Sequence, residues 1–276
     1  MASPTPLTSS LLPLLVLARI SALLVALLLL CWSLAFRSSF LPQYSSQEGL
    51  IYPLLHPLLM VIGFILVSGE AILVHRWPPG SRNLRKSVHL CLQGVALASG
   101  VFGIWTKFHH EDGVVANFYS LHSWMGLICV FLFGAQWGWG RNSGPIHVIS
   151  IVDINWKASK PHYCVNYIMS SMDKWLMGFL SFWHRGEARR ARVEVLPWHI
   201  FLGLYTYGLA VATAETGLLE KLTFLQTKRG LSRHCAESMV VNILGLGLAL
   251  LCGIVILAAV SPKYRILQTK LAYSDR

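Results

Sequence analysis

Four of the eleven histidines in this chain lie inside or at the start of long apolar runs, where ionisable side chains are rare and usually functional. They are His56, His89, His122 and His199. The first three follow one another at intervals of 33 residues, enough for one membrane crossing and one turn. Alternate histidines then return to the same side. The spacing therefore predicts two levels, one with His56 and His122 and the other with His89 and His199.

Each predicted level offers two imidazoles that face each other across a helix bundle, which is the ligand pair that six-coordinate haem iron needs. The two levels would lie roughly 20 Å apart in a hydrocarbon core of about 30 Å. Zinc is the competing metal, because imidazole binds zinc, copper and iron alike. Neither level supplies a third histidine, a cysteine or an aspartate, which argues against a closed tetrahedral zinc site.

Small residues follow the four histidines at helical spacings of four or seven. They are Gly63, Ala96, Gly126 and Gly203. Small side chains at these positions leave room for a flat ligand, but the same pattern also serves ordinary helix packing in membranes. Both interpretations stay open at this point.

The runs that carry the histidines are long enough to cross a bilayer, which takes about 20 residues. Of all 276 residues, 54% are apolar and 13% charged, against about 25% charged in soluble domains. The sequence therefore predicts an all-α membrane protein with six transmembrane helices. The spans are predicted at 20–36, 52–74, 89–107, 118–139, 198–219 and 239–260. A signal peptide is the alternative for the first run, but no A-x-A-like site follows it.

The net charge of +11 follows the predicted topology and does not require a nucleic-acid partner. Arg19 marks the cytoplasmic end of the first span. Sixteen of the other Lys and Arg residues then fall in the cytoplasmic segments, and six fall on the opposite side. Short basic segments stay in the cytoplasm, so residues 1–19 and the tail 262–276 are both expected there. The six cysteines form no CxxCH motif, so a haem would be held without covalent attachment.

Several stretches of this chain resemble the cytochrome b561 family in its plant form, and together with the spans they cover most of the sequence. They are YPLLHPLLM (52–60), GEAILVHR (69–76), LRKSVHL (84–90), NFYSLHSWMG (117–126), FWHRGEARRARVEVLPWH (182–199) and FLGLYTYGLA (201–210).

The resemblance implies a six-helix membrane protein whose central four-helix bundle holds two non-covalent b haems. It implies the same pairs of ligands, His56 with His122 and His89 with His199. Ascorbate is the implied cytoplasmic electron donor, and monodehydroascorbate or a ferric chelate is the implied acceptor on the opposite side. A homodimer in the vacuolar or plasma membrane is the expected setting.

The resemblance also implies two substrate sites. Arg85, Lys86 and Arg192 match its basic ascorbate site, and an anionic substrate favours cationic donors there. Each of these residues also fits a plain positive-inside anchor. On the opposite side, Phe108 and the pair His109 and His110 occupy the position of the acceptor site. A solvated loop is the alternative for the two histidines.

Residues 138–175 depart from the family pattern as an unusual insertion in the cytoplasmic loop between the fourth and fifth helices of the domain 20–261. The insertion interrupts the inner end of the fourth helix, so it bears most on the level of His89 and His199. Two alternatives to electron transfer follow. One is an isoform with one haem or none, and the other is a histidine-dependent metal transporter.

Overall fold

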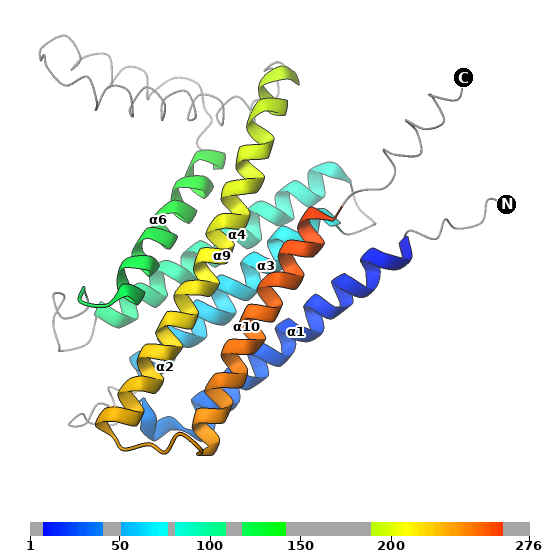
Figure 1. Ribbon diagram of the computed structural model, residues 1–276. Helices are drawn as coiled ribbons and strands as arrows, with labels where there is room; N and C mark the ends of the chain where they lie inside the picture. The colour runs from blue at the N-terminus through cyan, green and yellow to red at the C-terminus, as the bar shows by residue number, and fades with distance from the viewer. Residues whose placement is uncertain (1–7, 41–50, 77–80, 109–117, 142–188, 262–276) are drawn as a thin grey trace, which may run out of the picture. The chain divides into compact units, whose positions relative to one another are not determined.

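The computed structural model of the protein describes residues 8–40, 51–76, 81–108, 118–141 and 189–261 (Figure 1). Within these ranges every regular element is a helix, which confirms the all-α prediction. The chain divides into two compact units. Residues 1–130 and 207–276 form unit 1, and residues 131–206 form unit 2.

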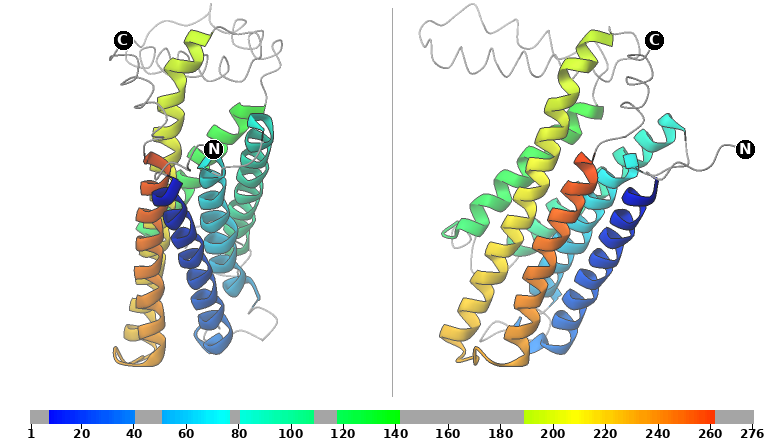
Figure 2. Two further views of the ribbon diagram at one scale, coloured as in Figure 1. Left: turned by 90° about the vertical axis from the view of Figure 1, so that its right-hand side faces the viewer. Right: turned by 45° about the vertical axis from the view of Figure 1, so that its right-hand side comes forward.

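Unit 1 brings together helices from both ends of the chain. In chain order, the described helices are α1 (Thr8–Ala35), η1 (Arg37–Ser39), α2 (Ile51–Leu58), η3 (Leu59–Leu66), α3 (Val67–Leu73), η4 (Val74–Arg76), α4 (Arg82–Phe108), α6 (Leu121–Arg141), α9 (Arg189–Lys228) and α10 (Ala236–Val260). α6 enters unit 1 with residues 121–130 and α9 with residues 207–228. Within the unit α1 packs against α10, while α2, η3 and α3 pack against α4 (Figure 2).

Four of the described helical stretches are long and apolar enough to cross a membrane. They are Leu11–Ala35, Ile51–Arg76, Arg82–Phe108 and Ala236–Val260. Their outward side chains include large aliphatic residues such as Leu23, 60% exposed, and Leu246, 61% exposed, which suit contact with lipid. α6 has a shorter apolar stretch, Leu121–Gln136. The fourth and fifth of the six predicted spans, in α6 and α9, therefore stay predictions.

The helical stretch from residue 51 to residue 76 changes its winding just after Pro57. α2 ends at Leu58, and η3 continues as a π-helix, in which the N–H of Val67 donates to the carbonyl of Ile62 five residues back. Proline lacks a backbone N–H, and its ring clashes with the carbonyl four residues earlier, so a regular α-helix is disturbed there. π turns are frequent at functional sites. This one begins three residues after His56.

Polar side chains tie α1 and the short helix η1 to other helices of unit 1. Nε of Arg19 lies 3.5 Å from Oε1 of Glu70 in α3, so the charge inside the first apolar run is paired. Near the other end of α1, Nε1 of Trp32 donates to Glu237 at 3.0 Å, and Oγ of Ser39 donates to the same carboxylate at 2.8 Å. Glu237 is only 3% exposed and lies in the first turn of α10, where the helix dipole favours a negative charge.

Unit 2 is described through residues 131–141 of α6 and 189–206 of α9. Nε2 of Gln136 donates to Oγ1 of Thr206 at 3.1 Å, which joins the two helices within the unit. The part of the predicted insertion from residue 142 to 175 lies outside the described residues.

Candidate cofactor site between two histidines

His56 of α2 and His122 of α6 lie side by side in unit 1. Their ring centroids are 6.1 Å apart and their planes are inclined at 82°. A metal–imidazole bond of about 2 Å on each side of an ion, plus about 1 Å from each nitrogen to its ring centre, separates two ring centres by about 6 Å. The two imidazoles are therefore spaced as opposite ligands of one metal ion.

Both rings are held by backbone carbonyls of neighbouring helices. Nδ1 of His56 donates to the carbonyl of Gly103 in α4, and Nδ1 of His122 donates to the carbonyl of Thr213 in α9, each at 2.8 Å. A carbonyl only accepts hydrogen bonds, so Nδ1 must carry the proton in both rings. Nε2 is then left with its lone pair, which is the state of a metal-binding histidine.

The chain on either side of His122 fixes the place of its ring. The backbone N–H of Ser123 donates to Oγ of Ser120 at 3.2 Å, so Ser120 caps the N-terminus of α6. His122 is therefore the second residue of α6. Across from the ring, α9 carries Gly217. A Cβ at that position would lie 2.7 Å from Cε1 and 2.8 Å from Nδ1 of His122. A side chain at position 217 would therefore displace the imidazole.

A cavity of about 720 Å³, including space open at its mouth, adjoins both rings. Sites for small molecules and cofactors typically have mainly apolar walls with a few polar groups. This cavity is lined by His56, Met60, Phe64, Ile65, Ile104, Lys107, Phe108, His122, Ser123, Gly126, Leu127, Cys129, Val130, Ala210, Thr213 and Ala214. Two imidazoles at the spacing of metal ligands, beside a cavity with mainly apolar walls, suit a mainly apolar metal complex such as haem.

The small residues singled out from the sequence take different roles. Gly126 lines the cavity, as the interpretation of room for a ligand requires. A Cβ on Gly63 would lie 2.5 Å from both Cβ and Oγ of Ser99, so this glycine serves the close approach of η3 and α4. Ala96 of α4 is fully buried. In unit 2, a Cβ on Gly203 would meet only the amide oxygen of Gln136, at 4.0 Å.

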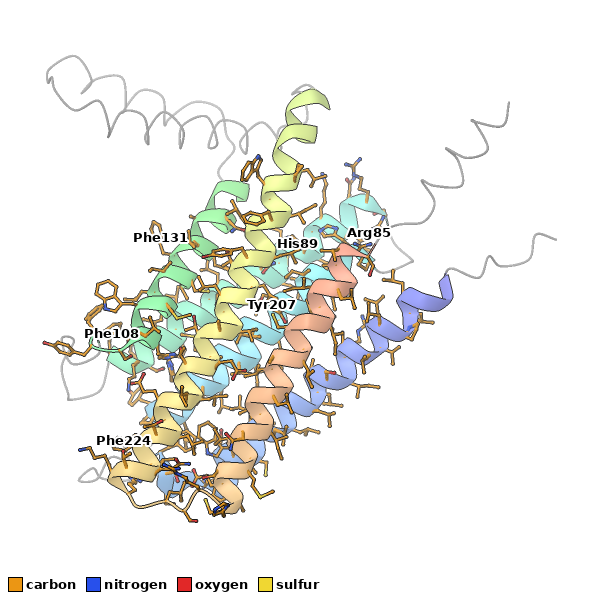
Figure 3. All side chains as sticks on the ribbon, viewed as in Figure 1. Arg85, His89, Phe108, Phe131, Tyr207 and Phe224 are labelled. Carbon is orange, nitrogen blue, oxygen red and sulfur yellow. The ribbon has the colours of Figure 1, made fainter. Side chains whose placement is uncertain are left out.

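His89 of α4 has a similar backbone contact but different surroundings. Its Nδ1 donates to the carbonyl of Ala71 in α3 at 2.8 Å, and its ring centroid lies 4.8 Å from that of His75. Arg85 lies one helical turn before it, and Lys86 follows Arg85 in the chain. Figure 3 shows Arg85 and His89 toward one end of the helices of unit 1 and Phe108 toward the other.

The remaining predicted site residues are divided between described and undescribed parts of the chain. Phe108 lines the cavity, and its ring centroid lies 5.7 Å from that of Phe118. His199 lies in unit 2 whereas His89 lies in unit 1, so their pairing stays a prediction. Two histidines and one side chain lie outside the described residues: His109, His110 and the side chain of Arg192.

Among the residues that the structure describes, no three His, Cys, Asp or Glu side chains come together as a metal site. The pair His56 and His122 suits a metal group that brings further ligands of its own, as a porphyrin does. Sequence reasoning missed Gly103, Thr213 and Gly217, which hold or make room for these two rings. No local sequence signal marks them, because each acts on a histidine of another helix.

Apolar helices long enough to cross a membrane, with two imidazoles at metal-ligand spacing beside a cavity, are typical of membrane proteins that hold a cofactor between two histidines. The sequence profile of eukaryotic cytochrome b561 matches residues 55–143 and 164–225, and the chain belongs to this family. Membership confirms the resemblance seen in the sequence and implies a b-type haem. The unmatched residues 144–163 fall inside the predicted insertion 138–175.

Individual relatives align over nearly their whole length. The chain is 58% identical over 261 residues to the probable transmembrane ascorbate ferrireductase 4 of Arabidopsis thaliana, covering 94% of this chain and 91% of the relative. It is 36% identical over 252 residues to transmembrane ascorbate ferrireductase 2 of the same plant, covering 91% and 92%. It is 35% identical over 247 residues to the ascorbate-specific transmembrane electron transporter 1 of Zea mays, covering 89% and 87%.

Proposed function

We propose that this chain transfers electrons from cytoplasmic ascorbate, through two b haems, to monodehydroascorbate or a ferric chelate on the opposite side of a membrane. The net reaction balances in single electrons. Ascorbate monoanion loses one electron and one proton and becomes monodehydroascorbate. On the opposite side, monodehydroascorbate takes up one electron and one proton, or a ferric chelate takes up one electron and becomes ferrous.

The observation that carries the proposal is the arrangement of His56 and His122. Their ring spacing of 6.1 Å suits opposite ligands of one metal ion. Their Nδ1 protons are both engaged by backbone carbonyls, which leaves Nε2 of each ring to bind. The family to which the chain belongs supplies the identity of the group, and its relatives carry names of ascorbate-dependent ferrireductases and electron transporters.

The bound haems would supply one-electron oxidation and reduction, while the protein supplies ligands, orientation and a dry setting. His56 and His122 would hold one haem, and His89 with His199 would hold the second. With histidines supplying both protein ligands of each haem, substrates would exchange electrons without binding the metal. Arg85 and Lys86, close to His89 in α4, attract the ascorbate anion, and we assign Arg192 to the same site. Phe108, with His109 and His110, receives the acceptor.

Haem stoichiometry tests the proposal. The purified protein is analysed by pyridine haemochrome assay and by spectra reduced with dithionite or with ascorbate. Two b haems per chain, both reduced by ascorbate, are expected. One haem would point to an isoform in which the insertion 138–175 disables the level of His89 and His199. A folded protein without haem would overturn the proposal and favour metal transport or packing as the role of the histidines.

Transfer across the membrane is tested with vesicles that contain the purified protein and are loaded with ascorbate. Reduction of an external ferric chelate that the bilayer excludes is expected, and it should stop when His56 is replaced by alanine. Equal rates in protein-free vesicles would remove the case for transmembrane transfer.

A further inference from the structure

The carbonyls that hold His56 and His122 each accept a second hydrogen bond from a threonine. Oγ1 of Thr106 donates to the carbonyl of Gly103 at 2.7 Å, and the same carbonyl accepts Nδ1 of His56. On α9, Oγ1 of Thr216 donates to the carbonyl of Thr213 at 2.8 Å, and that carbonyl accepts Nδ1 of His122. In both cases the threonine stands three residues after the carbonyl, on a different helix from the histidine.

A threonine hydroxyl that bonds back to a carbonyl of its own helix is common in itself. Oγ1 of Thr227, for example, donates to the carbonyl of Thr223 at 2.8 Å. What sets the first two apart is that their acceptors also hold the candidate haem ligands. The carbonyl of Ala71, which accepts Nδ1 of His89, has no such threonine. Val74 stands three residues after Ala71, and valine has no hydroxyl.

Sharing a carbonyl has a definite electronic effect on the imidazole. A carbonyl that accepts only the Nδ1–H polarises that bond strongly and makes the ring a more basic ligand. When a hydroxyl donates to the same carbonyl oxygen, that oxygen accepts the Nδ1 proton less strongly. A less basic ligand stabilises ferric iron less, so the reduction potential of the haem rises.

We infer that Thr106 and Thr216 are positioning residues that raise the reduction potential of the haem held by His56 and His122. They act through the shared carbonyls of Gly103 and Thr213 and touch neither substrate nor iron. The inference rests on the proposed function, since it concerns the same pair of histidines. It adds a role for two hydroxyls that the ligand set alone does not require.

The test replaces each threonine by valine, which keeps the branched shape and removes the hydroxyl, in T106V, T216V and the double variant. Redox titration of the purified holoprotein resolves the midpoint potentials, and the electron paramagnetic resonance spectrum of the oxidised form reports on the imidazoles. Each single variant is expected to lower one midpoint by about 30 mV, a threefold change at about 59 mV per tenfold. The double variant should shift the same midpoint further, and the second midpoint should stay fixed.

Two controls isolate the hydroxyl. T227V removes a threonine back-bond in the same helix α9 as Thr216 and should leave both midpoints unchanged. T106S and T216S keep a hydroxyl and should restore the potential of the unaltered protein.

Unchanged or raised midpoints in both valine variants with full haem content would overturn the inference while leaving the proposed function intact. Loss of the haem from both valine variants would also overturn it, because weaker competition for the carbonyl predicts a retained ligand. Absence of haem from the unaltered protein would instead refute the proposed function.

Discussion

His89 and the pair His56–His122 make the same kind of hydrogen bond through Nδ1, but different groups surround their rings. In all three rings Nδ1 donates to a backbone carbonyl of another element at 2.8 Å, so the tautomer is fixed in the same way. Around His56 and His122 the neighbours are an apolar cavity and threonine hydroxyls. Around His89 they are a second imidazole and a basic helical turn.

This difference separates two tasks that a haem-binding membrane protein must perform. The common hydrogen bond leaves Nε2 of each histidine as the nitrogen that would bind a metal. The surroundings then decide how readily the bound group accepts an electron and which substrate approaches it. The proposed relay would thus combine similar ligands with different surroundings at its two ends.

Removing a ligand should produce the largest effect. His56→Ala and His122→Ala should each reduce the haem content from about two to about one per chain, because the one remaining imidazole would hold the haem poorly. His89→Ala should cause the same loss but remove the other midpoint potential. Pyridine haemochrome assays and redox titration measure both quantities. His234→Ala, a change at an exposed loop residue, is the control. If His56→Ala and His89→Ala removed the same midpoint, the two levels would not be distinct.

Filling the space beside His122 should weaken the same site without touching a ligand. In Gly217→Ala the new Cβ would lie 2.7 Å from the ring, so the imidazole must move away from the carbonyl of Thr213. Haem affinity should fall by about 10- to 100-fold, as when an outer partner of a ligand is lost. Haem transfer to an apo-globin measures it. Gly208→Ala, in the same helix with nothing within 4 Å of its Cβ position, is the matched control. Equal affinities in the two variants would contradict this role of Gly217.

Removing positive charge beside His89 should change the kinetics of the donor and leave haem content intact. The double variant Arg85→Ala, Lys86→Ala should raise the KM for ascorbate by about tenfold, since a charge-assisted hydrogen bond contributes about 1.5–3 kcal/mol. The dependence of the rate on salt should flatten as well. Stopped-flow reduction by ascorbate measures both. The variant Lys107→Ala, at the cavity of the other site, should leave the ascorbate KM unchanged. A matching rise in both variants would show that the basic turn has no special role.

A smaller effect concerns Lys221 of α9, whose ionisation should make the stability of the protein depend on pH. Burial first, and then the charges of Arg229 and Lys107, lower the pKa of Lys221 to about 8, while Glu237 raises it. Lys221 lies beyond the predicted span and over the ring of Phe40, 5.4 Å from its centroid.

Because this pKa is lower in the folded protein than in the unfolded chain, charged Lys221 destabilises the fold below pH 8. That penalty is relieved as pH rises through 8 towards the unfolded value of 10.5. The thermal midpoint should rise by roughly 2–4 °C between pH 7 and pH 9.5, and Lys221→Met should remove this rise. Lys228→Met, a change at an exposed lysine of the same helix, serves as the control. A persistent rise in Lys221→Met would assign it to another group.

Patterns among neighbouring residues predicted the parts of the fold that depend on local interactions. Apolar runs predicted helices, and the motif around His122 identified the family, because both are written in neighbouring residues. Helix ends were less accessible. α9 extends from Arg189 to Lys228, well past the predicted span 198–219, since hydropathy reports contact with lipid and a helix continues through polar residues of good propensity.

The groups that hydrogen-bond the histidine rings could not be predicted from the sequence, for a physical reason. His122 and the carbonyl of Thr213 are 91 residues apart, and a backbone carbonyl has no residue type to recognise. Gly217 looks like any small residue in a membrane helix. Regular spacing could propose which histidines share a level, but only the packing of α4, α6 and α9 shows what holds their rings.

The contact of Glu237 with Trp32 and Ser39 has a consequence for biogenesis. Ser39 and Glu237 are 198 residues apart in the chain. At a synthesis rate of about 5–20 residues per second, roughly 10–40 s pass before the carboxylate exists. Arg19 meets Glu70 much sooner, so one end of α1 is anchored early and the other late. The contacts of Trp32 and Ser39 with Glu237 therefore form only after α10 is made, and a nascent chain stopped before α10 lacks them.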